Sequence, residues 1–79
     1  MNNLEKYKKI FCESFSIEEN MLDDNLEYNS IDSWDSVGHM GLIANLEEAF
    51  EIMMDTDDII DFSSFEKGKE ILKKYNIEM

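Results

Sequence analysis

Apolar residues recur at helical spacing near the start, in the middle and near the end of this chain. The first set predicts a helix over residues 3–15, because its members lie three or four positions apart: Leu4, Tyr7, Ile10, Phe11 and Phe15. A second helix is predicted from Asp35 to Ile52. Asp35 is a suitable N-cap, since its carboxylate can accept a hydrogen bond from a free N–H group of the first turn.

The last third of the chain predicts one short helix and one longer one. A helical turn is expected near Thr56–Asp61, with Thr56 as a candidate cap. The longer helix begins at a capping box, in which Ser63 precedes Glu66 by three positions. Its inward face is predicted to consist of Phe65, Gly68, Ile71, Leu72 and Tyr75. Glycine weakens a helix by about 0.8–1 kcal/mol relative to alanine, so Gly68 indicates a close approach of neighbouring groups.

Residues 16–34 follow neither a helical nor a strand pattern. Their scattered apolar residues predict an ordered loop that is anchored to the core at several points, namely Ile17, Met21, Leu22, Leu26, Tyr28 and Ile31. No segment shows the alternation that is typical of a β-strand. The predicted fold is therefore all-α: one domain over residues 1–79, a small four-helix bundle with three longer helices, one short helix and a long loop between the first and second helices.

The charge distribution limits the kinds of partner. The formal net charge is −12, and all seven basic residues are lysines located before residue 10 or after residue 66. Phosphate contacts depend on lysine and arginine, so nucleic acid and anionic membranes are unsuitable partners. Protein surfaces with basic patches suit this charge, and complementary charge would speed their encounter.

Cys12 is the only cysteine, which favours a reducing compartment and excludes a disulfide framework. The first residues lack the apolar stretch of a signal peptide, and no apolar run reaches the roughly 18 residues of a membrane span. A cytoplasmic protein that does not insert into membranes, and that is monomeric, is expected.

The predicted second helix has apolar residues on two faces. One stripe, which we assign to the core, contains Leu42, Ile43, Leu46, Ala49 and Phe50. A second set lies on another side, beside three glutamates, and comprises Val37, Met40, Ala44, Glu47, Glu48 and Glu51. We interpret this second face as a docking surface for partners that are basic and partly apolar.

Ser36 follows Asp35 directly and falls in the first exposed turn of that helix. Nothing in the nearby sequence would activate it as a nucleophile, so we interpret it as a site to which another molecule is attached. The N-terminus of a helix favours an anion, and a phosphodiester on Ser36 would be stabilised there without a nearby lysine or arginine.

These residues resemble those of the acyl carrier protein family. Asp35-Ser36-Val37 is similar to the Asp-Ser-Leu attachment motif of that family. The stretch from Leu46 to Ile52 is similar to the Leu-Glu-x-x-Phe-x-Ile pattern that closes the second helix of these carriers. The acidic segment Asp55–Asp61 and the final apolar helix follow in the same order, so the resemblance covers nearly the whole chain.

The resemblance implies a four-helix bundle that is not an enzyme. A phosphopantetheinyl transferase would move 4′-phosphopantetheine from coenzyme A onto Ser36, with Asp35 supporting the modification. The thiol of the arm would hold an acyl or aminoacyl group as a thioester, to be loaded and transferred by enzymes with basic docking patches. The docking face would then be the set from Val37 to Glu51 named above.

Two positions depart from the family pattern. Val37 is smaller than the usual leucine, which affects partner affinity more than attachment. Trp34 stands where carriers of fatty-acid synthesis have glycine or alanine, and together with Gly38-His39-Met40 it resembles carriers of specialised pathways. A specialised biosynthetic role is therefore the interpretation, with housekeeping fatty-acid synthesis as the alternative; an acidic helical adaptor that is never modified is the alternative from another class.

Two other kinds of site are unfavourable. A hydrolase built on Ser36 and His39 lacks a third orienting group and an oxyanion hole, so a partly buried packing role is expected for His39. The acidic segments do not match the EF-hand loop, since Ile60 occupies the position of its glycine. No catalytic residue and no metal site are predicted.

Overall fold

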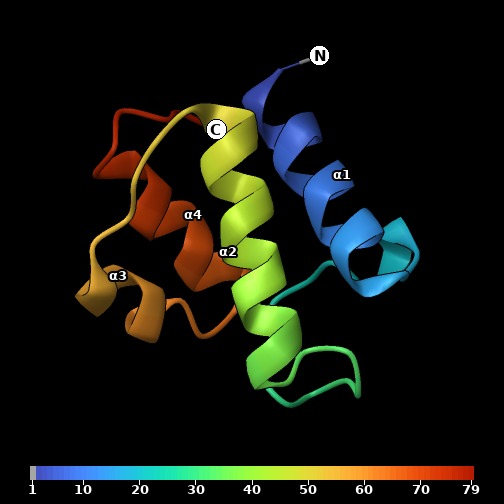
Figure 1. The fold of residues 1–79 in the computed structure, drawn as a ribbon. Helices are drawn as coiled ribbons and strands as arrows, with labels where there is room; N and C mark the ends of the chain where they lie inside the picture. Colours follow the sequence, from blue (N-terminus) through green and yellow to red (C-terminus); the bar gives the residue numbers. More distant parts are fainter. Residues whose placement is uncertain (1) are drawn as a thin grey trace.

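A computed structural model describes residues 2–79 of the chain and confirms the all-α four-helix bundle (Figure 1). The described residues form four α-helices and one short 3₁₀ turn: α1 (Asn3–Phe15), η1 (Glu19–Met21), α2 (Ser36–Phe50), α3 (Thr56–Asp61) and α4 (Phe65–Lys73). In Figure 1, α1 and α2 lie side by side and run in opposite directions. None of the helices in the described range is long and apolar enough to cross a membrane.

The first helix occupies the predicted residues, and the second ends two residues earlier than predicted. The side chain of Asn2 caps α1 by accepting a hydrogen bond from the N–H of Glu5. Helix α2 stops at Phe50 because Glu51 adopts a left-handed conformation, with φ 55°. The N–H groups of Glu51 and Ile52 then both bond to the carbonyl of Glu47. This pattern satisfies one of the carbonyls at the helix end, that of Glu47, with two donors.

At two helices the N-cap is the residue next to the one predicted. Asp55, not Thr56, is the N-cap residue of α3, although its side chain makes no capping bond. Ser64, not Ser63, caps α4: its hydroxyl accepts a hydrogen bond from the N–H of Lys67 at 2.9 Å. The two serines are adjacent, and a capping-box pattern alone cannot show which of them has the extended backbone that an N-cap needs.

An aromatic cluster forms the centre of the core. Its rings come from the two ends of the chain and from the loop before α2, and they contact one another edge-on or stacked: Tyr7, Phe11, Phe15, Trp34, Phe62 and Phe65. Aromatic pairs of this kind contribute about 0.5–1.5 kcal/mol each beyond the burial of their surface. Leu42, Ile43 and Leu46 bring the inner face of α2 into the same core, as predicted, while Ala49 and Phe50 are half-buried at its edge.

Gly68 lies where α4 meets α1. A Cβ atom at this position would stand 2.2 Å from the hydroxyl of Tyr7 and 2.3 Å from the ring of Phe62. The close approach expected from the sequence is therefore present. It places the Tyr7 hydroxyl within 2.7 Å of the carbonyl of Phe65, to which it donates a hydrogen bond. Burial raises the pKa of the Tyr7 phenol far above its usual value.

The long loop between α1 and α2 is pinned to the start of α4. Leu26 is buried, and the N–H of Phe65 donates to its carbonyl at 2.9 Å. The N–H of Tyr28 donates in turn to the carbonyl of Ser63 at 2.8 Å. Met21 and Tyr28 were predicted to anchor the loop, but they remain partly exposed. The loop is anchored mainly by Leu26 and by Trp34, whose side chain is fully buried.

Helix α3 is tied to the end of α4 by a buried carboxylate. Asp58 accepts hydrogen bonds from the Nζ of Lys74 and the hydroxyl of Tyr75, each at 2.5 Å. These two bonds hold the pKa of Asp58 below its usual value and raise the pKa values of both partners. Tyr75, predicted as part of the last helix, lies in the turn after Lys73, where its hydroxyl also accepts from the N–H of Asp55.

Candidate functional site

Ser36 is the first residue of α2 and is exposed. Asp35 is the N-cap, as predicted: its Oδ1 accepts a hydrogen bond from the N–H of Gly38 at 2.8 Å. The backbone carbonyl of Asp35 accepts from the N–H of His39, also at 2.8 Å. The cap therefore fixes the first turn of α2, at the lower end of this helix in Figure 1, and Ser36 is exposed in that turn.

The loop before α2 crosses its first turn closely at Gly38. A Cβ atom on Gly38 would lie 1.9 Å from the carbonyl oxygen of Ser33, a distance that no side chain tolerates. Glycine at this position therefore lets the segment that contains Trp34 fold back against α2. This packing places the Trp34 ring in the core two residues before the exposed Ser36.

A groove of about 320 Å³ opens beside Ser36, between α2, α3 and the loop. Its lining is mostly apolar and comes from three segments: Tyr28 from the loop, Ser36, His39 and Met40 from α2, and Ile59, Ile60, Phe62 and Ser63 from α3 and the segment after it. Small-molecule sites are typically concave, mostly apolar and provided with a few polar groups. The groove has this character, with the Ser36 hydroxyl among its polar groups.

His39 separates this groove from the core. Trp34 donates a hydrogen bond from Nε1 to the Nδ1 of His39 at 3.0 Å, and the Nε2 of His39 lies 2.8 Å from the carbonyl oxygen of Ile59. An indole N–H can only donate, so Nδ1 accepts and the proton of the neutral imidazole is on Nε2, which donates to Ile59. The partly buried packing role predicted for His39 is present, and both ring nitrogens are satisfied.

The outer face of α2 and its C-cap residue, Glu51, carry the predicted docking residues. Five of the six have exposed side chains: Val37, Met40, Ala44, Glu48 and Glu51. Val37 is 81% exposed and Met40 is 56% exposed, which is a large apolar exposure for one short stretch of helix. Glu47 differs, because it is half-buried and its Oε2 accepts a hydrogen bond from the N–H of Met54 at 2.9 Å. Its carboxylate holds the segment after α2 and is less available to a partner.

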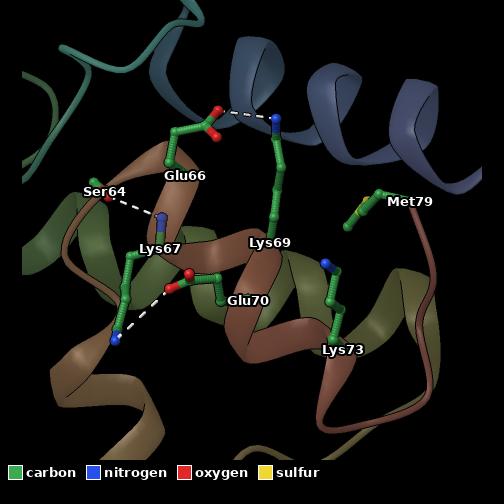
Figure 2. A pocket seen from close by; sticks show the side chains of 7 residues that line it. All are labelled: Ser64, Glu66, Lys67, Lys69, Glu70, Lys73 and Met79. Atoms are coloured by element: carbon green, nitrogen blue, oxygen red, sulfur yellow. Dashed lines mark hydrogen bonds and ion pairs between the residues drawn. The ribbon is translucent and has the colours of Figure 1, made fainter.

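A second, larger hollow of about 540 Å³ lies on α4, far along the chain from Ser36 (Figure 2). Four of its five charged side chains are paired within the helix, Lys69 with Glu66 at 2.9 Å and Lys67 with Glu70 at 3.9 Å, and the fifth, Lys73, is the basic residue of the last turn. The hydroxyl of Ser64, at its edge, is the cap of α4 and is already bonded to the N–H of Lys67. The hollow on α4 is thus lined mainly by exposed charges that pair with one another. The smaller groove beside Ser36 is the better candidate for a functional site.

Several groove residues were not singled out from the sequence as site residues. Ile59, Ile60, Phe62 and Ser63 lie more than twenty positions from Ser36, and only the packing of α3 against α2 brings them together. The sequence carries no signal for this grouping: the 71% exposure of Ile60, which leaves α3 with an uncovered apolar side chain, is evident only in the fold. Within residues 2–79, no group of three or more His, Cys, Asp and Glu side chains is placed to hold a metal ion.

None of the protein-family models, curated proteins and solved structures compared with this chain matches it. The Ser36 groove and the surface around it are the features of this structure that point to a function.

Proposed function

We propose that this protein is a carrier that holds an acyl or aminoacyl group as a thioester on a 4′-phosphopantetheine arm attached to Ser36. The observation that carries the proposal is the position of Ser36: an exposed hydroxyl in the first turn of α2, at the edge of an apolar groove. A hydroxyl placed in this way is accessible to a modifying enzyme, and the groove offers apolar surface to a group attached there.

The attachment requires a partner enzyme, because the two candidate bases near Ser36 among the described residues, Asp35 and His39, are already engaged in hydrogen bonds. His39, the only histidine, already uses both ring nitrogens. A phosphopantetheinyl transferase would supply the base that takes the serine proton. The Ser36 oxygen would form a bond to the β-phosphorus of coenzyme A, and the P–O bond to 3′,5′-adenosine bisphosphate would break. Asp35 supports this step by fixing the first turn of α2 in an accessible conformation.

The electrostatics of the helix start suit the product. Helix N-termini stabilise anions through their free N–H groups and the positive end of the helix dipole. Asp35 occupies the N–H of Gly38, so a phosphodiester on Ser36 would meet the N–H groups of Ser36 and Val37. No lysine or arginine is needed, in agreement with their absence from the sequence between Lys9 and Lys67.

The exposed face of α2 supports the choice of partners. Val37 and Met40 supply apolar contact beside Ser36, while Glu48 and Glu51 supply negative charge further along. An enzyme with a basic rim around an apolar patch would complement both. Trp34 and the Gly38-His39-Met40 stretch favour a specialised biosynthetic pathway in the cytoplasm over housekeeping fatty-acid synthesis.

Intact-mass measurement tests the proposal. The protein coexpressed with a broad-specificity phosphopantetheinyl transferase should gain the mass of one arm, and Ser36→Ala should abolish the gain. Ser63→Ala is the matched control, since Ser63 is an exposed serine that lines the same groove. A wild-type mass that stays unchanged beside an active transferase would leave the unmodified acidic adaptor as the better explanation. Thioester-bound cargo, recovered from the native cell and identified by mass spectrometry, would define the pathway.

A further inference from the structure

A wall separates the Ser36 groove from the core. It consists of two consecutive hydrogen bonds through His39 and of the aromatic rings of Trp34 and Phe62. The first hydrogen bond joins Trp34 Nε1 to His39 Nδ1, and the second joins His39 Nε2 to the carbonyl of Ile59. These two bonds therefore join the loop, α2 and α3 at the level of the groove. Phe62, which lines the groove, is 1% exposed, and its ring stacks on Phe11 in the core behind it.

The rings of this wall pack against one another. The imidazole of His39 lies nearly parallel to the indole of Trp34, with an interplanar angle of 14°, and meets the ring of Phe62 edge-on. Trp34 is fully buried and contacts Phe11 and Phe15. An acyl chain could enter the core here only by separating these rings and breaking both bonds of His39. The buried indole N–H would then have no partner, which is a costly state for a polar group.

We propose that this wall, which we call the Trp34–His39–Ile59 latch, keeps the cargo outside the core and in the surface groove. The inference rests on the proposed attachment to Ser36. The arm and the first atoms of the cargo would lie against Met40 and Ile60, which are 56% and 71% exposed in the free protein. At about 320 Å³ the groove is at the small end of the usual range for ligand sites, roughly 300–1,000 Å³.

The latch therefore selects a class of cargo. A short acyl or aminoacyl group would leave little apolar surface outside the groove, whereas a long chain would extend beyond Ile60 into water. This carrier would not shield a long acyl chain from water. We therefore expect the enzymes that load the carrier to use compact carboxylic acids. His39 acts here as a positioning residue, which determines where the cargo lies without touching the thioester.

The chain provides its own reporter, because Trp34 is the only tryptophan. The transferase can attach butanoyl- or decanoyl-phosphopantetheine from the corresponding coenzyme A thioesters. The Trp34 indole N–H resonance and the thermal midpoint are then measured for each loaded form and for the unacylated form. In the wild-type protein, we expect both acyl groups to shift the methyl resonances of Met40 and Ile60 and to leave the indole resonance and the midpoint unchanged.

Opening the latch should reverse this result for the long chain alone. In His39→Ala, we expect decanoyl to shift the indole resonance and to raise the midpoint above that of the unacylated variant, while butanoyl does neither. Met40→Ala is the control: it removes a groove contact and should keep the wild-type indole resonance with both acyl groups.

The wild-type measurement decides the question even if His39→Ala does not fold. A decanoyl group that shifts the Trp34 indole resonance and raises the midpoint of the wild-type protein would overturn the inference and leave the attachment to Ser36 intact. Absence of any mass gain beside an active transferase would overturn the attachment, and this inference with it.

Discussion

Helices α2 and α4 both bury an apolar stripe in the same core, yet their outer faces differ in a way that separates function from folding. The outer face of α2 leaves Val37 and Met40 largely exposed and carries carboxylates without a matching lysine. On the outer face of α4, Lys67 and Lys69 pair with glutamates one turn away. Most of the charge on α4 is therefore balanced within the helix, whereas the exposed apolar and unmatched acidic groups on α2 remain available to a partner.

The two helices also hold α3 by different chemistry. Helix α2 reaches it through a neutral histidine, which donates to the carbonyl of Ile59. The turn after α4 reaches it through charge, since Lys74 and Tyr75 both donate to the buried carboxylate of Asp58. The groove beside Ser36 depends on the position of α3, so both attachments support the candidate site, and they should respond differently to mutation and pH.

Large and opposite effects on stability are expected from Gly68 of α4 and Gly41 of α2. Gly68→Ala would place a Cβ atom 2.2 Å from the Tyr7 hydroxyl and should destabilise the fold by roughly 1–3 kcal/mol, the usual range for overpacking. Gly41→Ala in α2 is the matched control, because no atom lies within 4 Å of its added Cβ. It should stabilise the fold by up to about 1 kcal/mol through helix propensity. Urea unfolding measures both, and equal effects would show that α4 does not approach α1 closely.

The charged attachment of α3 predicts the pH dependence of stability. Asp58 has a lowered pKa in the folded protein, so its contribution is present above the unfolded value, about 3.9, and is lost as the pH falls through the folded value. Lys74 and Tyr75 have raised pKa values, so their contributions are present below about pH 10 and are lost as the pH rises further. The free energy of unfolding should therefore show a broad maximum around neutral pH and decline in acid and in strong base.

Asp58→Asn tests this assignment. It should lower the thermal midpoint at pH 7 and flatten its decline in acid, because the carboxylate that titrates is gone. Asp57→Asn is the control, since Asp57 is an exposed neighbour on the same short helix. An acid limb of the wild-type curve that persists unchanged in Asp58→Asn would assign the acid sensitivity to other carboxylates.

The serines at the starts of the two helices should separate folding from modification. Ser64→Ala removes the cap of α4 and should cost about 1 kcal/mol of stability, while the gain of one arm beside a transferase is retained. Ser36→Ala should change stability by less than about 0.5 kcal/mol, as is usual for surface substitutions, and abolish the gain. Denaturant unfolding and intact mass, measured on both variants, give the two readouts. Loss of modification in a folded Ser64→Ala variant would contradict the separation.

Much of the fold follows from the sequence, because the apolar spacing of α1 and the inner face of α2 is regular. The end of α2 was predicted wrongly because apolar residues continue to Ile52, whereas the backbone of Glu51 turns left-handed to cap the helix. The groove was missed for a different reason. Tyr28, Met40 and Ile60 belong to three separate segments, and only tertiary packing brings them beside Ser36. Periodicity reports the faces of one helix and cannot show which faces meet.

The smallest expected effect concerns the charges on the outer faces. Glu48→Lys reverses an exposed charge on the proposed docking face of α2 and should slow phosphopantetheinylation several-fold at low salt, because complementary charge acts mainly on the association rate. Glu70→Lys introduces the same charge change on the outer face of α4, where Glu70 pairs with Lys67, and should leave the rate near that of the wild-type protein. The slowing caused by Glu48→Lys should shrink as added salt screens the exposed charges. Equal slowing by the two variants would mean that net charge, and not the face of α2, guides the modifying enzyme.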